Sequence, residues 1–224
     1  MKPIIGDMIL QAVLYAVPLL FGVVAHEVAH GWTADKLGDP TAREKGRITL
    51  NPFVHIDPVG TVILPIVLLL SHSPFLFGWA KPVPVQFENL RGGRRDASLV
   101  ALSGPATNFL LACLSAVIYH LIYAGFKQGI IPQQGLIGSL AEPVFMMARI
   151  SVSFNVVLMI INLLPIPPLD GGRVLLGLLP LGLASRLERV EKFGMLIVLL
   201  LIGTGLWGYI VRPVLHVILH FFLD

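Results

Sequence analysis

Long apolar runs separated by short polar stretches dominate the chain. The runs at 8–32, 97–126, 137–164 and 193–209 carry few charged residues. At 1.5 Å per helical residue, each is long enough, or nearly so, to cross the roughly 30 Å hydrocarbon layer of a bilayer. The pattern therefore predicts an all-α polytopic membrane protein with about four full transmembrane helices.

Two shorter apolar stretches do not fit a full crossing. The stretch 59–76 is interrupted by Pro65 and ends in Ser71-His72-Ser73-Pro74, and the stretch 174–184 is too short. If 59–76 crossed, the basic loops 35–57 and 80–96 would lie on opposite sides with four Lys or Arg each. If it returns to the side from which it entered, both basic loops share one side with eight Lys or Arg. The next two loops, on alternating sides, then carry one (126–137) and four (165–192). The second pattern fits the positive-inside rule, so we predict a re-entrant or interfacial hairpin at 59–76. The stretch 174–184 is predicted to be a short helix at the cytoplasmic face.

Composition supports a membrane protein of one domain. The 224 residues are 55% hydrophobic and 13% charged, about half the charge of a soluble domain. We expect a single membrane-embedded domain over 1–224, with its core at 8–172 and a C-terminal helix at 193–220. The net charge is +3 without a basic arm, so no nucleic-acid partner is expected. Cys113 is the one cysteine and lies in an apolar run, which excludes an internal disulfide and favours a packing role.

The end of the first apolar run carries the candidate chemistry. His26-Glu27-Val28-Ala29-His30 is an H-E-x-x-H motif, and positions i and i+4 share one face of a helix. The two imidazoles can bind one Zn²⁺, with Glu27 beside it as the base that deprotonates the attacking water. Residues 8–25 contain no ionisable side chain other than Tyr15, and ionisable groups at membrane depth are typically functional.

The predicted topology supplies a third ligand. The spans 8–32 and 137–164 run in the same direction, so their C-terminal ends meet at one membrane face. Asp170 follows the second of these spans, and its carboxylate can complete a site with His26 and His30. His55 and Asp57 lie in a loop on the same side and are an alternative source of ligands, although a turn that satisfies backbone groups is the simpler interpretation.

Several motifs together resemble a known family. The H-E-x-x-H motif, the run Asn162-Leu163-Leu164-Pro165-Ile166-Pro167-Pro168-Leu169-Asp170-Gly171 and the segment Ser103-Gly104-Pro105-Ala106-Thr107-Asn108 resemble the signatures of the site-2 protease family of intramembrane zinc metalloproteases. The resemblance implies one zinc held by His26, His30 and Asp170, with Glu27 as general base. It also implies a polar role for Asn162 near the scissile bond and a supporting role for Asn108. The chain has no room for a PDZ or CBS domain, so it resembles a minimal, core-only branch.

Other histidines and a tryptophan segment are further candidate functional groups. His216 and His220 are also four residues apart but have no Glu between them, and they are expected at the outer interface. Thr33 and Lys36 stand where a metzincin needs Gly and His, which excludes that class. The Gly78-Trp79 segment is either an edge that holds an extended substrate or an interfacial anchor.

The sequence thus predicts that the protein is a zinc metalloendopeptidase that crosses the cell membrane several times. Its expected substrates are membrane-spanning proteins, cleaved near the cytoplasmic face in regulated intramembrane proteolysis. The alternative is a zinc-binding or metal-transporting membrane protein without proteolytic activity. A transporter would be expected to place ionisable residues along a full path across the bilayer, whereas here they gather at one face.

Overall fold

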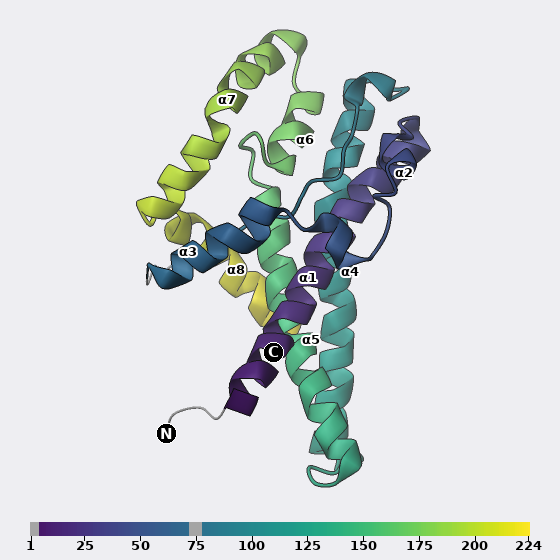
Figure 1. Ribbon diagram of the computed structural model, residues 1–224, viewed down its shortest axis with the longest axis vertical. Helices are drawn as coiled ribbons and strands as arrows, with labels where there is room; N and C mark the ends of the chain where they lie inside the picture. The colour runs from purple at the N-terminus through teal and green to yellow at the C-terminus, as the bar shows by residue number, and fades with distance from the viewer. Residues whose placement is uncertain (1–4, 72–77) are drawn as a thin grey trace.

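The computed structural model describes residues 5–71 and 78–224, and all regular structure within these ranges is helical (Figure 1). The predicted all-α class is therefore confirmed. The long helices are α1 (Ile5–Leu37), α4 (Arg94–Lys127), α5 (Leu136–Asn162), α7 (Leu181–Gly203) and α8 (Leu206–Leu223). The short helices are α2 (Thr41–Glu44), α3 (Leu64–Leu70) and α6 (Asp170–Leu178), with single turns at η1 (Pro52–His55), η2 (Pro58–Ile63) and η3 (Phe87–Asn89).

Three of the described helices are long and apolar enough to cross a membrane. These segments are Ile9–Leu37 in α1, Arg94–Lys127 in α4 and Leu136–Asn162 in α5. Most of their apolar side chains face outward; Leu110 and Leu121 of α4, for example, are 65% and 67% exposed. Apolar surface on this scale is typical of contact with lipid, so the protein is a membrane protein.

Helices α1, α4 and α5 pack against one another and form the centre of the molecule. Between α4 and α5, small residues such as Ala112 and Ala116 meet Val152 and Val156, which lets the two helices approach closely. Helix α8 covers this contact with Val211 and Phe222. Helices α1 and α5 also contact each other, and their C-terminal ends lie at the same end of the bundle, as the sequence predicts (Figure 1).

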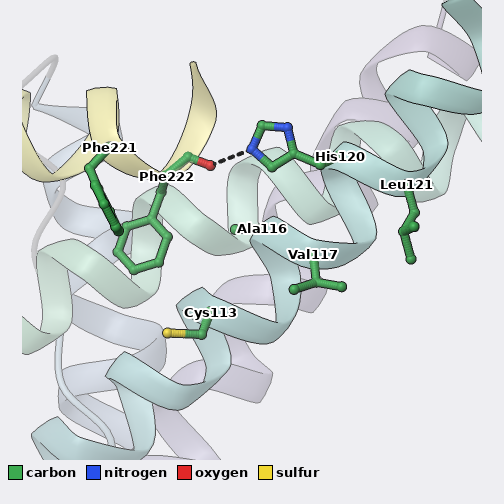
Figure 2. A pocket seen from close by; sticks show the side chains of 7 residues that line it. All are labelled: Cys113, Ala116, Val117, His120, Leu121, Phe221 and Phe222. Atoms are coloured by element: carbon green, nitrogen blue, oxygen red, sulfur yellow. Dashed lines mark hydrogen bonds between the residues drawn. The ribbon is translucent and has the colours of Figure 1, made fainter.

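The far half of α4 borders a groove of about 470 Å³ against α8 (Figure 2). Cys113 borders this groove and packs against the core between α4, α5 and α8, in agreement with its expected packing role. Nε2 of His120 donates a hydrogen bond of 2.9 Å to the carbonyl oxygen of Phe222. This bond fixes the C-terminal end of α8 against α4.

The C-terminal part differs from the prediction. The stretch 193–209, predicted as one span, and the predicted C-terminal helix 193–220 are both divided between α7 and α8. The break lies at Thr204 and Gly205, where Gly205 has a φ of +75°. Glycine adopts this left-handed conformation without the steric cost that other residues meet, and it ends α7. Helix α7 also begins at Leu181, well before the predicted start.

Two segments near the end of α1 shape the site. After η1 the chain passes through η2 and α3. Trp79 then lies beside η2 again, since its backbone N–H donates to the carbonyl of Gly60 at 3.2 Å. Of the predicted hairpin 59–76, residues 72–76 lie outside the described residues. The segment 78–86 then runs beside α1 without regular secondary structure, and Lys81 N donates to His55 O at 2.9 Å.

Candidate metal centre

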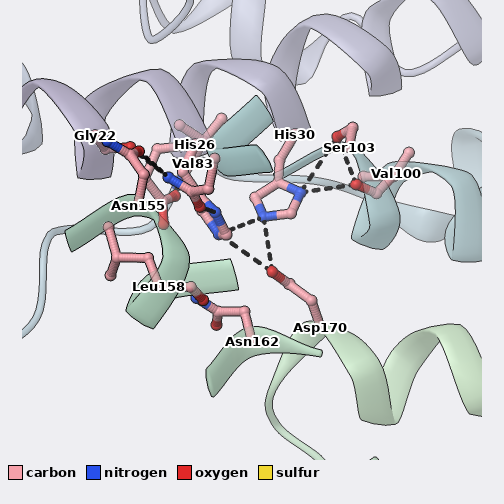
Figure 3. Close-up of polar contacts among 12 residues, drawn as sticks. Gly22, His26, His30, Val83, Val100, Ser103, Asn155, Leu158, Asn162 and Asp170 are labelled. Atoms are coloured by element: carbon pink, nitrogen blue, oxygen red, sulfur yellow. Dashed lines mark hydrogen bonds and ion pairs between the residues drawn. The ribbon is translucent and has the colours of Figure 1, made fainter. Parts of the chain in front are cut away.

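The structure brings His26, His30 and Asp170 together (Figure 3). Nε2 of His26 and Nε2 of His30 lie 3.0 Å apart on one face of α1. Oδ2 of Asp170 lies 3.1 Å from His26 Nε2 and 3.3 Å from His30 Nε2. The cluster thus joins the C-terminal part of α1 to the first residue of α6, although 140 positions separate them in sequence.

The placement of Asp170 depends on close backbone packing around α6. A Cβ on Gly171 would lie 2.3 Å from the carbonyl oxygen of Leu163, and a Cβ on Gly172 would lie 2.3 Å from the nitrogen of Pro167. Only glycine therefore allows the loop after α5 to fold against the start of α6. At the other end, the guanidinium of Arg94 donates to the carbonyls of Leu176 and, at 3.0 Å, Leu179. Arg94 caps carbonyls at the end of α6 that have no partner within the helix.

The second nitrogen of each imidazole bonds to an acceptor. Nδ1 of His26 donates to Oδ1 of Asn108 at 2.7 Å, and Nδ1 of His30 donates to the carbonyl oxygen of Val100 at 2.7 Å. A carbonyl oxygen can only accept, so His30 must carry its hydrogen on Nδ1. Both Nε2 atoms then face the cluster with their lone pairs, which is the usual arrangement of metal-binding histidines.

The residues present fit a metal ion. Two imidazole lone pairs and a carboxylate oxygen converge on one small volume, and Oδ2 of Asp170 is buried and accepts no hydrogen bond. Two imidazole nitrogens and one carboxylate oxygen match the protein donor set of catalytic zinc sites, in which water or substrate takes the fourth position.

Gly104 of α4 gives the site its space. A Cβ at this position would lie 2.5 Å from Cε1 of His26 and 2.5 Å from Nε2 of His30. The absence of a side chain lets α4 pack directly behind both imidazoles. This explains why a glycine in the Ser103-Gly104-Pro105 segment matters to a site on another helix.

Glu27 lies beside the cluster but is not part of it. Its Oε2 accepts a hydrogen bond of 2.8 Å from the backbone N–H of Val83. Val83 can approach α1 because Gly31 has no side chain; a Cβ there would lie 2.7 Å from Cγ1 of Val83. The segment is further held by Arg47, which donates to the carbonyl of Lys81 at 2.8 Å.

Asn162, the last residue of α5, donates from Nδ2 to the carbonyl of Leu158 at 3.0 Å (Figure 3). His55 is 2% exposed and its Nε2 donates to Thr49 O, while Asp57 accepts from Val59 N and Gly60 N. Neither belongs to the cluster, so the structure favours the turn interpretation over the alternative ligands. The exposed His216 and His220 of α8 also lie outside it.

Two contributors were missed from the sequence. Asn155 of α5 is fully buried and hydrogen-bonds to Asn108. The sequence feature that could have indicated its role is a single amide side chain within an apolar run. Such a group is costly in a bilayer and is therefore a candidate for function. The N–H of Val83 had no such signal, because a backbone donor is present at every residue other than proline.

Comparisons with known proteins agree on the class. The sequence model of Peptidase family M50 matches residues 127–203. A protein of Bacillus subtilis (strain 168) named as the zinc metalloprotease YwhC is 33% identical over 200 residues, which cover 89% of this chain and 84% of the relative. Proteins named as the zinc metalloprotease Rip2 are 29% identical in Mycolicibacterium smegmatis and Mycobacterium tuberculosis, where the match covers 64% and 52% of their lengths. No solved structure gives a significant match.

An H-E-x-x-H helix that meets a carboxylate among apolar helices is the arrangement of a membrane-bound, zinc-dependent peptidase. The chain belongs to peptidase family M50, the site-2 protease family, and is a zinc metalloendopeptidase whose cofactor is Zn²⁺.

Proposed function

We propose that the protein cleaves peptide bonds of transmembrane helices near the cytoplasmic face of the cell membrane. The observation that carries this proposal is the position of the metal cluster. His26 and His30 belong to a membrane-spanning helix, and Asp170 directly follows the end of another. A site at this depth favours substrates that are themselves embedded in the bilayer over soluble proteins.

The geometry of the site supports a proposed role for each of its residues. His26, His30 and Asp170 would hold the zinc, which would supply Lewis-acid polarisation of the scissile carbonyl and would lower the pKa of the attacking water to about 7. Glu27 takes the proton from that water and passes it to the leaving amine. Asn162, the last residue of α5, would hydrogen-bond the substrate backbone or the developing oxyanion. A helical substrate must unwind first, because its own hydrogen bonds shield the peptide carbonyls.

The proposed membrane topology includes a re-entrant segment after α1. The apolar residues Ile63, Ile66, Val67 and Leu70 of this segment are exposed. Its start and end are adjacent, since Thr61 Oγ1 donates to Trp79 O at 2.8 Å in addition to the Trp79–Gly60 bond. A stretch whose two ends meet returns to the side from which it began. This supports basic loops 35–57 and 80–96 on one cytoplasmic side, with α7 and α8 together forming the fourth crossing.

The segment 78–86 is a candidate substrate-binding edge. An extended substrate could pair with it by strand addition, the possibility raised by Gly78-Trp79. Pro82 and Pro84 lack backbone donors, so such pairing would rely mainly on the carbonyl oxygens of the segment.

The metal-transport alternative finds less support: among the described residues, one group of His, Cys, Asp and Glu side chains is arranged to hold a metal, at one end of the bundle.

The test compares the wild-type chain with Glu27→Gln in proteoliposomes that contain a single-span test protein. We expect Glu27→Gln to bind zinc with wild-type stoichiometry and to release no fragments, whereas Glu44→Gln, an exposed matched control, cleaves normally. In cells, single-span stubs should accumulate with the mutant and co-purify with it. Cleavage by Glu27→Gln at the wild-type rate would contradict the mechanism. Zinc flux without cleavage by the wild type would favour transport.

A further inference from the structure

A chain of hydrogen bonds runs from the middle of α5 to the metal cluster through the interior of the bundle. Asn155 Nδ2 donates to the carbonyl oxygen of Ser151 at 2.9 Å, and Asn155 Oδ1 accepts from Asn108 Nδ2 at 2.9 Å. Asn108 Oδ1 in turn accepts from His26 Nδ1 at 2.7 Å. Both asparagines are fully buried (0% exposed), and the chain connects α5, α4 and α1.

Backbone carbonyls fix the direction of every bond in this chain. The carbonyl oxygen of Ser151 can only accept, so Asn155 must turn its NH₂ group toward it and its Oδ1 toward Asn108. The NH₂ group of Asn108 then faces two acceptors, Asn155 Oδ1 and the carbonyl oxygen of Gly22 at 3.2 Å. Oδ1 of Asn108 is left for His26, whose Nδ1 must carry the hydrogen.

The opposite orientation of Asn108 would disable His26. A flipped amide would set Asn108 Oδ1 against two other acceptor oxygens and would present its NH₂ group to Nδ1 of His26. The imidazole would then carry its hydrogen on Nε2, and a protonated Nε2 cannot bind a metal ion. Gly22 O alone, at 3.2 Å, is a long acceptor, so Asn155 contributes most to the preference for the productive orientation.

We propose that Asn155 is a positioning residue for the metal site, which holds Asn108 in the one orientation that leaves Nε2 of His26 free for zinc. This inference rests on the proposed assignment of His26 as a ligand. Asn155 touches neither metal nor substrate, and it acts through Asn108. Partners of metal-binding histidines typically contribute 10- to 100-fold to metal affinity, and we expect roughly tenfold for this more distant residue.

The packing around Asn155 offers an independent way to disturb it. A Cβ on Gly22 would lie 2.9 Å from Asn155 Oδ1, so α1 and α5 approach closely at this level (Figure 3). Gly22→Ala would push Oδ1 away while improving the helix propensity of α1. Gly22→Ala therefore perturbs the hydrogen bond between Asn108 and Asn155 without lowering the helix propensity of α1.

The experiment measures zinc affinity of the full chain in detergent by competition with a chromophoric chelator, together with the absorption spectrum of the Co²⁺-loaded protein. Asn155→Leu removes the acceptor at similar volume, and Asn155→Asp keeps an acceptor oxygen in its place. Ser115→Ala is the matched control, because Ser115 donates only to Ser151 Oγ at 2.8 Å, at the remote end of the chain of bonds.

We expect Asn155→Leu and Gly22→Ala to weaken zinc binding about tenfold and to alter the Co²⁺ spectrum. Asn155→Asp and Ser115→Ala should stay within about threefold of the wild type. If Asn155→Leu does not fold, Gly22→Ala decides. The inference would be overturned by unchanged zinc affinity in Asn155→Leu or in a folded Gly22→Ala. Equal losses of zinc affinity in Asn155→Leu and Asn155→Asp would overturn it as well. Neither result would contradict the metal site itself. A wild-type chain that binds no zinc would overturn both.

Discussion

The backbone N–H of Val83 donates a hydrogen bond of 2.8 Å to Oε2 of Glu27. A charged acceptor gains more from such a bond than a neutral one, and the bond restrains one carboxylate oxygen while leaving the other free. The segment 78–86, which is far from the H-E-x-x-H motif in sequence, therefore orients the proposed general base.

Removing this donor should slow the reaction without loss of metal. Val83→Pro deletes the N–H within a segment where prolines already flank the position, and we expect kcat to fall about 10- to 100-fold, since a hydrogen bond to a charged group contributes about 1.5–3 kcal/mol. Val83→Ala keeps the donor and controls for the lost side chain. The measurement is cleavage rate in proteoliposomes at matched zinc content. Equal rates for Val83→Pro and Val83→Ala would show that the bond does not matter.

Gly104→Ala should weaken zinc binding. The new Cβ would lie 2.5 Å from atoms of both imidazoles, so at least one ring must move. Overpacking of this kind costs about 1–3 kcal/mol, which corresponds to roughly 5- to 150-fold in zinc affinity if the strain falls on the site. Chelator competition measures this affinity. Ala106→Val adds volume on the exposed face of the same helix and is expected to bind zinc normally.

The elements that the sequence predicts well are those with a strong local pattern. His26 and His30 are four residues apart on one helix, and Asp170 is placed by the direction of two apolar spans, so their proximity follows from helix geometry and topology. Asn155 and Val83 contribute through contacts between helices and segments that no local periodicity encodes. Predicting these contacts requires the packing angles of α1, α4 and α5.

The division of the last predicted span has a different cause. Mean hydropathy over 193–209 does not register a break in the backbone, because Thr204 and Gly205 lie between strongly apolar residues. A glycine inside an apolar run was the available signal, but glycine is common in membrane helices and does not by itself indicate a helix end.

Zinc removal should destabilise the protein, because the cluster joins α1 to α6. A ligand that binds only the folded state at 100 times its Kd stabilises by about 2.7 kcal/mol. We expect chelation to lower the Tm in detergent and zinc to restore it. Asp170→Asn should have a low Tm that responds weakly to either treatment. A wild-type Tm that is insensitive to chelation would contradict a structural link through the metal.

A final prediction concerns acid stability at the end of α1. Asp39 is fully buried and accepts hydrogen bonds from Thr41, from Gln86 N at 2.7 Å and from Asn89 Nδ2 at 3.0 Å. It thereby ties the end of α1 to the segment 78–90. Burial raises the pKa of Asp39, but these donors outweigh that effect and hold it below its ordinary value of 3.8.

Because the pKa of Asp39 is lower in the folded than in the unfolded state, the carboxylate stabilises the fold above about pH 4, and this contribution is lost as the pH falls through the folded pKa. Asp39→Asn should therefore lower stability at pH 7 by about 1–3 kcal/mol, since its NH₂ group would face another donor. Its Tm deficit relative to the wild type should shrink below pH 4. The exposed Glu44→Gln should show neither effect, and an Asp39→Asn deficit that is constant from pH 7 to pH 3 would contradict the assignment.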